Sequence, residues 1–338
     1  MIVKGFRLFL NLISSVIYQI KIFTLAVMTG LVTKSTGSWY AVRIESGEVL
    51  ECRLKGKIRL DDRKTTNPVS VGDIVDIERD KDGSNQITKI HPRKNYIIRK
   101  SINLSKQAHI IASNLDQAIL VATIVAPRTS LGFIDRFLVT AEAYGIPAKI
   151  VFNKKDVLDE EMLELQNDIM KLYIDIGYDC YAVSAFDNKD IDFIKTLLKD
   201  KTTLLSGHSG VGKSTLVNAI DPSLDLKIGD ISFTHLKGMH TTTFAELFPL
   251  SFGGNIIDSP GIKELGLVEM KKEEVAHYFP EMVERMNDCK FNNCLHVNEP
   301  GCAILKAVES GEISQERYQS YLGILNGEEM DWKEWEIR

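Results

Sequence analysis

A chain of 338 residues is long enough for two or three domains that each bury a core of their own. Its 44% hydrophobic and 26% charged residues are typical of a globular protein, and its net charge of −5 argues against a general nucleic-acid binder. The charge is uneven, because residues 29–104 hold 15 Lys and Arg against 10 Asp and Glu, whereas residues 105–338 hold 23 against 36. The basic excess therefore lies in the N-terminal third.

Residues 1–28 contain three basic side chains, no acidic one, and an apolar stretch over residues 8–20. This stretch is short for a membrane-spanning helix and is interrupted by polar residues. We expect an upstream extension, with the native start at Met28. The alternatives are an anchor that lies at a membrane surface and a signal peptide, although no clear cleavage site follows.

Residues 29–104 are predicted to form a small all-β domain followed by a linker. Five β-rich stretches separated by turns lie at residues 31–34, 39–44, 49–54, 73–78 and 86–91. Five short strands in this space favour a barrel of the OB type. The basic residues from Arg93 to Lys100 are expected to belong to the linker.

One strand of this barrel and the loop after it carry a cluster of cationic residues: Arg53, Lys55, Lys57, Arg59, Arg63 and Lys64. Trp39, Tyr40 and Tyr96 are available as stacking surfaces. Cationic groups beside exposed aromatic rings are typical of surfaces that bind single-stranded nucleic acid. A solvated basic edge strand, with the aromatic rings in the core, is an equally good interpretation of the same residues.

Residues 105–265 alternate between strand and helix patterns. Strands are predicted at residues 117–125, 148–152, 181–183, 202–206, 245–248 and 254–257, and helices around 133–141, 160–173, 191–198 and 214–220. This alternation predicts a mostly parallel sheet with helices on both faces. Residues 266–338 are acidic and are predicted to be helical, and Tyr318, Tyr321, Leu322 and Leu325 mark one expected amphipathic helix.

A Gly-x-x-x-x-Gly-Lys-Ser loop lies between the strand at 202–206 and the following helix, as a phosphate-binding P-loop requires. It comprises Gly207, His208, Ser209, Gly210, Val211, Gly212, Lys213, Ser214 and Thr215. Its glycines let backbone N–H groups turn toward an anion at the positive end of the helix. Lys213 would reach the β- and γ-phosphates, and Ser214 would ligate magnesium. The alternative is a flexible turn that binds nothing.

The chain also carries base-reading motifs. Asn153, Lys154, Lys155 and Asp156 follow a predicted strand and resemble the Asn-Lys-x-Asp signature of GTPases. By that resemblance, Asp156 would accept hydrogen bonds from guanine, Lys154 would lie over the ring, and the backbone of Ser184 and Ala185 would contact guanine O6. A polar turn between strand and helix is the alternative.

Two further motifs complete a nucleotide-dependent switch. Asp258 and Gly261 belong to an Asp-Ser-Pro-Gly segment, in which Asp258 would hold Mg²⁺ through water and the Gly261 N–H would sense the γ-phosphate. Residues 238–243 would form switch I. One of Thr241, Thr242 and Thr243 would contact Mg²⁺ and the γ-phosphate.

The order of these motifs is permuted, because the base-reading motifs precede the P-loop instead of following it. A sheet whose chain ends lie close together can be opened elsewhere without a change in packing. With this order, a preceding barrel and a following cysteine cluster, residues 29–338 resemble the family of ribosome small-subunit-dependent GTPases. The resemblance implies GTP hydrolysis, with small ribosomal subunits and their rRNA as partners, in a late stage of maturation.

Cys289, Cys294, His296 and Cys302 supply three thiolates and an imidazole, which suffice for a tetrahedral Zn²⁺ site. Their spacing favours a metal only moderately, and the resemblance implies a zinc site on these four residues. Four protein ligands leave no open position, so the zinc would be structural. Cys52 and Cys180 are expected to be packing residues. Thiols beside a nucleotide loop fit a cytoplasmic protein.

The residue that orients the attacking water is not the usual one, because Ile262 stands where many GTPases carry glutamine. His240 in switch I is the candidate, and the resemblance implies the same residue; alternatively, His240 only shapes its loop. We expect a monomer that binds GTP and GDP with magnesium, without a DNA or membrane partner. A P-loop ATPase or kinase and a membrane-associated switch are the rival functions.

Overall fold

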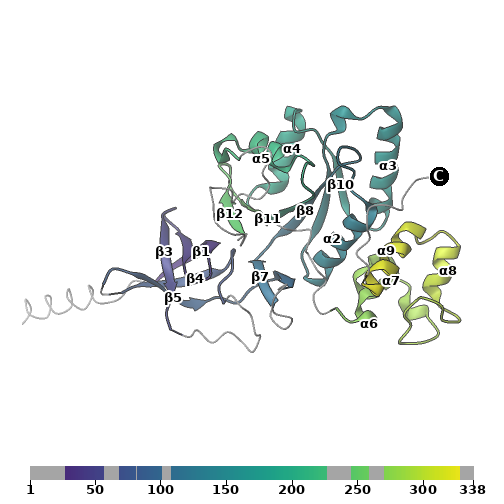
Figure 1. Cartoon of the computed structure of the whole chain (residues 1–338), viewed down its shortest axis with the longest axis horizontal. Coiled ribbons are helices and arrows are strands. Elements are labelled where there is room, and N and C mark those ends of the chain that lie inside the picture. The colour runs from purple at the N-terminus through teal and green to yellow at the C-terminus, as the bar shows by residue number, and fades with distance from the viewer. Residues whose placement is uncertain are drawn as a thin grey trace, which may run out of the picture.

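The computed structural model of the chain describes residues 27–56, 68–80, 82–100, 108–226, 245–258 and 270–327. A β-barrel, an α/β body and a helical lobe follow one another along the long axis (Figure 1). All three parts were predicted from the sequence. The prediction for the N-terminal extension concerns residues 1–28, of which all but Val27 and Met28 lie outside the described residues.

The barrel closes from five strands as an OB-type barrel does. They are β1 (Met28–Ser35), β2 (Tyr40–Ile44), β3 (Val49–Leu54), β4 (Ile74–Arg79) and β5 (Asn85–Ile90). The order β1-β2-β3-β5-β4 is closed by antiparallel pairing of β4 with β1, and β3 and β5 run parallel. Alternate residues point inward, so that Val32, Val42, Val75, Ile77 and Ile87 form the core.

The predicted stacking surface of the barrel is only partly confirmed. Trp39 is 43% exposed, and the Arg53 guanidinium lies 4.0 Å from the centroid of its ring. Tyr40 follows the alternative interpretation, since it is 1% exposed because alternation along β2 turns its ring into the core. Tyr96 is partly buried and packs against Tyr144. The cationic residues at positions 57, 59, 63 and 64 lie outside the described residues.

The predicted linker is wrong for residues 96–100, which form strand β6 (Tyr96–Lys100). This strand pairs antiparallel with β7 (Ala108–Ser113) in a small sheet of its own. Its buried side chain, Ile97, is 2% exposed. The basic residues of this stretch are typical of a linker, but its apolar and polar residues also alternate as they do in a strand.

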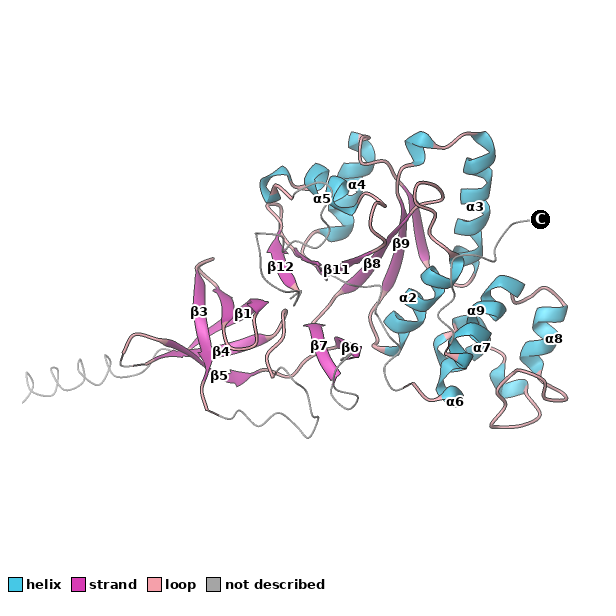
Figure 2. Cartoon of the chain, in the orientation of Figure 1, coloured by secondary structure: helices cyan, strands magenta, loops and turns pink. Residues whose placement is uncertain are grey.

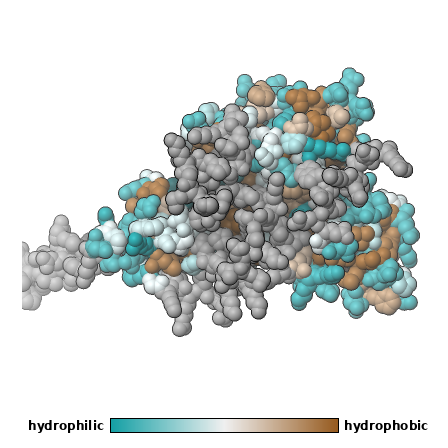
Figure 3. Space-filling model, in the orientation of Figure 1, coloured by the Kyte–Doolittle hydropathy of each residue, from teal (hydrophilic) through white to brown (hydrophobic). Residues whose placement is uncertain are grey.

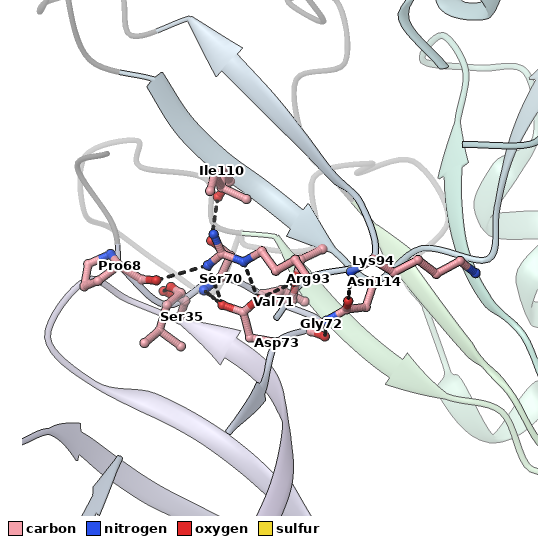
Figure 4. A network of polar contacts seen from close by, with 12 residues as sticks. Ser35, Pro68, Ser70, Val71, Gly72, Asp73, Arg93, Lys94, Ile110 and Asn114 are labelled. Carbon is pink, nitrogen blue, oxygen red and sulfur yellow. Dashed lines mark hydrogen bonds and ion pairs between the residues drawn. The ribbon is translucent and has the colours of Figure 1, made fainter. Parts of the chain in front are cut away.

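Arg93, also assigned to the linker, is a structural residue. Its guanidinium donates to both carboxylate oxygens of the buried Asp73 at 2.7 Å, and to the Pro68 carbonyl at 3.0 Å (Figure 4). The same carboxylate accepts hydrogen bonds from the Ser113 hydroxyl at 2.6 Å and the Ser70 N–H at 2.8 Å. The network joins the barrel to β7, so Arg93 is not part of a solvated basic surface.

The α/β body is built on six strands: β8 (Gln117–Ala122), β9 (Ala148–Phe152), β10 (Asp179–Ala182), β11 (Thr202–Ser206), β12 (Glu246–Pro249) and β13 (Asn255–Asp258). Their order is β10-β9-β8-β11-β13-β12, and β12 alone among them runs antiparallel to its neighbour in this sheet. The predicted bounds of β9 and β11 agree with the structure. The sheet is the doubly wound type that the sequence predicts.

Helices cover both faces of this sheet (Figure 2). They are α2 (Leu131–Ala143), α3 (Glu160–Asp175), α4 (Asn188–Leu198) and α5 (Lys213–Ile220). Along β8, Leu120 faces the core under α2 and α3, whereas Val121 faces the core under α4 and α5. A buried run without polar alternation is expected of a parallel strand covered on both sides. Short 3₁₀ turns lie at Lys155–Val157 and Pro222–Leu224.

The barrel is joined edgewise to the body, because β1 pairs antiparallel with β12 through Lys34 and Glu246. The side chains of these two residues also form an ion pair at 3.0 Å. Close by in the fold, Arg43 Nη2 donates to Asn255 Oδ1 at 2.6 Å. The barrel therefore extends the edge of the sheet that carries β12 and β13.

The helical lobe contains α6 (Lys272–Val275), α7 (Pro280–Val283), α8 (Ala303–Glu309) and α9 (Gln315–Asn326), with 3₁₀ turns at Ala276–Tyr278 and Met286–Asp288. Its core includes Phe279, Met282, Ile304 and Tyr321, together with Val139 from α2 of the body. Hydrophobic residues also gather on the surface of the lobe seen in Figure 3. Among the described residues, no helix has both the length and the apolar character needed to cross a membrane.

A buried ion-pair network fixes the lobe to the body. Arg317 of α9 donates to Asp135 of α2 at 2.7 Å and to Glu281 of α7 at 2.7 and 3.1 Å. All three side chains are at most 5% exposed, and Tyr173 of α3 donates to the same Asp135 oxygen at 2.8 Å. Burial would lower the pKa of Arg317, but the two carboxylates outweigh it and raise that pKa. The guanidinium therefore stays charged.

Arg317→Met should destabilise the protein by about 3–5 kcal/mol, because it leaves two carboxylates buried without their counter-ion. Urea unfolding followed by circular dichroism measures the free energy of unfolding. Arg285→Met is the matched control, since its ion pairs with Glu284 and Glu312 are exposed on the same lobe. It should cost less than about 1 kcal/mol. An equal loss of unfolding free energy in the two variants would show that the buried network does not hold the lobe on the body.

Candidate nucleotide site and metal centre

The predicted nucleotide-binding segments lie at one edge of the sheet, where parallel strands end. The P-loop follows β11, the Asn153–Asp156 segment follows β9, Ser184 follows β10 by two residues, and Asp258 ends β13. The carboxyl ends of such strands form the crevice in which doubly wound proteins hold ligands. His240, Thr241, Thr242, Thr243 and Gly261 lie outside the described residues.

Two glycines of the P-loop are required by their surroundings. Gly207 has a φ of +142°, and a Cβ there would lie 2.2 Å from the Val121 carbonyl oxygen. Gly212 has a φ of +90°, and a Cβ would lie 2.5 Å from the Asn153 amide nitrogen. Positive φ is easily reached only by glycine. The loop can therefore press against β8 on one side and against the base-reading segment on the other.

Lys213 and Asp258 are two buried ionisable residues that line the same pocket beside the P-loop. The Lys213 ammonium donates to the carbonyls of Gly207 at 2.5 Å and His208 at 2.7 Å, and the residue is 5% exposed. Burial lowers the pKa of Lys213 to about 8, against the opposing effect of Asp258. Burial likewise raises the pKa of Asp258 to about 7, against the effect of Lys213. Charged ligands would compensate both groups.

The residues predicted for magnesium fit that ion. Ser214 Oγ and Asp258 Oδ2 are buried, and neither has a hydrogen-bond partner among the described residues. Both side chains, with Lys213, line one pocket together with apolar residues of β11 and α5. Hydroxyl and carboxylate oxygens are the donors that Mg²⁺ takes from proteins beside phosphates. A buried oxygen without a partner is unfavourable unless a ligand satisfies it.

The base-reading segment is hydrogen-bonded to the P-loop. The Asn153 side-chain amide donates to the Val211 carbonyl at 2.9 Å. Lys154 has a φ of +69°, and its ammonium donates to the carbonyls of Ala126 at 2.6 Å and Gly210 at 2.7 Å. The structure thus joins motifs more than fifty residues apart in the chain, and the hydrogen bonds fix the alkyl chain of Lys154 against the P-loop.

Asp190 of α4, which the sequence analysis missed, ties the two base-reading loops together. Its carboxylate forms an ion pair with Lys155 at 2.7 Å and accepts the Ser184 N–H at 2.7 Å. The Asp156 carboxylate is exposed and takes no hydrogen bond from the described part of the chain. It is thus available to a ligand, whereas Ala185 is 9% exposed. The available signal was that Asp190 is an acidic residue in the first turn of the helix that follows the Ser-Ala segment.

His208 of the P-loop packs against α2. Its ring centroid lies 3.8 Å from that of Phe133, and the imidazole is 8% exposed. Ser209 and Gly210, by contrast, are exposed at the tip of the loop, and Thr215 is partly buried in the first turn of α5. The P-loop therefore rests on the helix that also carries Asp135.

The four predicted metal ligands are brought together in the helical lobe. Their donor atoms all lie within 4.8 Å of one another. Sγ of Cys289 lies 3.9 Å from Sγ of Cys302, and Nδ1 of His296 lies 3.6 and 3.4 Å from these two sulfurs. Tetrahedral zinc, with bonds of about 2.3 Å to sulfur and 2.0 Å to nitrogen, separates such donors by about 3.5–3.8 Å. The donor set therefore fits this ion.

Neighbouring groups hold the ligands in place. The N–H groups of Ala303 and Leu305 point to the sulfurs of Cys289 and Cys302, both at 3.4 Å. Hydroxyls of α9 fix the loop, since Tyr318 donates to the carbonyl of His296 at 2.7 Å. The Tyr321 hydroxyl donates to the carbonyl of Leu295 at 2.6 Å. Cys52 and Cys180 are buried elsewhere, as expected of packing residues.

Glu299 orders the same loop from the other side. Burial would raise the pKa of its carboxyl, but backbone N–H donors, among them those of Leu295, Val297 and Asn298, lower it to about 2. Three of these bonds measure 2.8, 2.9 and 3.1 Å. The carboxylate thus accepts the backbone hydrogen bonds that a helix or sheet would otherwise satisfy in this loop.

Comparison with known proteins finds the RsgA GTPase family over residues 90–268 and the RsgA N-terminal domain over residues 29–87. The chain is 54% identical over 309 residues to the small ribosomal subunit biogenesis GTPase RsgA of Flavobacterium psychrophilum, covering 90% of this chain and 95% of the relative. The protein of that name from Bacteroides fragilis is 53% identical over 302 residues, covering 89% and 97%.

Two solved structures resemble the whole arrangement. The crystal structure of YjeQ from Thermotoga maritima superposes with a TM-score of 0.71 at 34% identity and covers 89% of this chain and 98% of its own. The structure of YloQ, described as a circularly permuted GTPase, superposes with a TM-score of 0.69 at 32% identity, covering 90% and 96%. The permuted order inferred from the motifs therefore has a counterpart in a solved structure.

Asp190→Ala should weaken the binding of GDP by about tenfold, because the loss of two charge-assisted hydrogen bonds lets the base-reading loops separate. Isothermal titration calorimetry measures the dissociation constant. Asp192→Ala is the control, since Asp192 lies on the same helix, is exposed, and pairs only with Lys195 at 3.3 Å among the described residues. Equal affinities for GDP in the two variants would contradict the role of Asp190.

Proposed function

Because the chain belongs to the RsgA GTPase family, we propose that it acts as a GTP-hydrolysing factor in late maturation of the small ribosomal subunit, and that this subunit stimulates hydrolysis. Its curated relatives carry that biogenesis role in their names. The observation that supports the proposal best is that Asn153 and Lys154 donate hydrogen bonds to the P-loop. These bonds bring the base-reading and phosphate-binding segments together in one site.

The residues of the site have distinct roles in this proposal. P-loop N–H groups and Lys213 hold the β- and γ-phosphates, and Asp156 selects guanine over adenine. Ser214 would bind magnesium directly, and Asp258 would hold it through water. When bound, magnesium neutralises charge on the phosphate oxygens. These side chains position the γ-phosphate for in-line attack by water.

Water must be oriented by another group, because Ile262 has no polar side chain and replaces the glutamine of many GTPases. We assign this role to His240 of switch I, with one of Thr241, Thr242 and Thr243 completing the magnesium shell. Within the P-loop, the imidazole of His208 is buried against Phe133 of α2. Dependence on the ribosomal subunit follows naturally if the subunit orders switch I.

Small-subunit rRNA is the proposed partner of the barrel. The exposed Trp39 with Arg53 stacked on it offers the aromatic and cationic groups that bind single-stranded RNA. The barrel extends the sheet beside β12, so RNA on the barrel would lie along that edge of the body. A cytoplasmic monomer fits this role.

We further propose that the metal of the helical lobe is a structural zinc ion. Three cysteines and one histidine complete its coordination and leave no position for water or substrate. The metal would fasten the long connection between α7 and α8, which contains little regular structure. Its contribution would be to folding, and none to the hydrolytic step.

Purified small subunits should raise the rate of GTP hydrolysis by this chain, and ATP should not be a substrate. Release of phosphate with GTP or ATP, with and without subunits, measures this. His240→Ala should lower the stimulated rate by about a hundredfold with nearly unchanged affinity for GDP, as when a group positioned for proton transfer is removed.

His235→Ala, five residues before His240 in the chain, is the control and should retain stimulation of GTP hydrolysis by the subunit. Equal hydrolysis of ATP and GTP would favour the rival ATPase function. A GTPase rate that does not respond to subunits would refute the ribosomal role, and full stimulation of the His240→Ala variant would refute the role of that histidine alone.

Removal of the metal should unfold the helical lobe and leave the body folded. The purified chain should contain one zinc ion per molecule by atomic absorption, and Cys302→Ser should lose it together with part of the helical circular dichroism. Cys180→Ser, a change at a buried cysteine of β10, should keep its zinc. Full helicity in the zinc-free Cys302→Ser variant would contradict a structural metal.

A further inference from the structure

The two most exposed large hydrophobic side chains in the described part of the chain both lie beside the base-reading loops. Phe186 is 81% exposed and directly follows Ser184 and Ala185. Val157 is 59% exposed and directly follows Asp156. A phenyl ring left this far in water is unfavourable in a protein with no use for it.

The exposure of Phe186 is not the result of a loose loop. The Ser184 carbonyl accepts the Asp187 N–H at 3.2 Å, and the Ser184 hydroxyl accepts the Phe186 N–H at 3.1 Å. Asp187 then caps α4 by accepting the Lys189 N–H at 2.9 Å. The turn is thus fixed on both sides of Phe186, and the ring is presented from a rigid backbone.

This turn lies next to the loop that carries Asp156. Strands β9 and β10 are parallel neighbours with Phe152 opposite Ala182. Beyond the strands, the Lys155 N–H donates to the Val183 carbonyl at 3.1 Å. The Lys155 side chain and the Ser184 N–H share Asp190, as described above. A base held by Asp156 therefore lies within reach of the turn.

Lys154 can cover only one face of that base. Hydrogen bonds from its ammonium to the Gly210 and Ala126 carbonyls hold its alkyl chain on the side of the P-loop. Phe186 is carried by the neighbouring loop after β10, so its ring would be available to the other face of the base. Aromatic rings gain affinity by stacking on a nucleobase, whichever base it is.

We propose that Phe186 stacks on the face of guanine that Lys154 does not cover. The inference rests on the proposed function, since it needs the base to be held by Asp156. Phe186 then supplies affinity for the base without selecting it, because every nucleobase has a π-face, whereas Asp156 supplies the selection.

Phe186→Ala should weaken GDP binding by about tenfold and leave the binding of inorganic pyrophosphate unchanged, as loss of base stacking requires. Phe186→Trp should bind GDP about as tightly as the unchanged chain. Ile174→Ala is the control, since Ile174 is 50% exposed on α3, away from both base-reading loops. Calorimetry on the full chain measures all the affinities, and thermal melting shows that each variant is folded.

The outcomes separate the two proposals. If the unchanged chain binds ADP as tightly as GDP, guanine recognition itself is wrong. If the unchanged chain prefers GDP and Phe186→Ala binds GDP equally well, stacking is refuted. Equal weakening of GDP and pyrophosphate would also refute it, because the change would then act through the phosphates. Loss of subunit stimulation with unaltered GDP affinity would instead place Phe186 on the ribosome, against the proposal.

Discussion

The buried contact of Arg317 with Asp135 and Glu281 decides how the helical lobe is attached to the body. An isolated charge in such a place would be strongly unfavourable, so the three groups are stable only together and only in this geometry. Asp135 belongs to the body, whereas Arg317 and Glu281 belong to the lobe. The lobe therefore cannot rotate freely on α2 without exposing or separating charges, and a particular orientation is specified.

That orientation connects the metal centre to the nucleotide site through a short series of packed groups. The P-loop imidazole of His208 rests on Phe133, and two residues further along α2 lies Asp135. On the other side, Arg317 is followed by Tyr318, whose hydroxyl holds the carbonyl of His296. The lobe is thus anchored to the body by a helix that the P-loop contacts, independently of the chain connection that follows Asp258.

Much of the nucleotide site could be predicted because phosphate and guanine chemistry require fixed residue types at fixed spacings. The P-loop, Asn153–Asp156 and the cysteine cluster are short segments, and their local sequence carries the signal. Asp190 was missed although its place in the first turn of α4 was a signal, whereas Arg317 could not be found from local sequence. The partners of Arg317 lie 182 and 36 residues away in the chain, and a lone charged residue in a helix is usually exposed.

Errors in the barrel have the same origin. The residue type left Tyr40 either at the surface or in the core, and its place in the alternation of β2 directs it into the core. Arg93 and the strand β6 were assigned to a linker from charge alone, although the buried Asp73 neutralises one of those charges. Residue type predicts chemistry well, but burial depends on neighbours that only the folded chain brings together.

The pairing of Lys34 with Glu246 also constrains the order in which the molecule can assemble during synthesis. These residues are 212 positions apart, so the barrel leaves the ribosome long before β12 exists. In the same way, strands β9 and β10 emerge before the P-loop, to which the segment after β9 becomes hydrogen-bonded. Because domains generally fold as units from the N-terminus, the nascent chain passes through a stage in which β8, the later centre of the sheet, has a free edge awaiting β11. Circular permutation therefore leaves the finished site unchanged and delays its completion until nearly the whole body has been made.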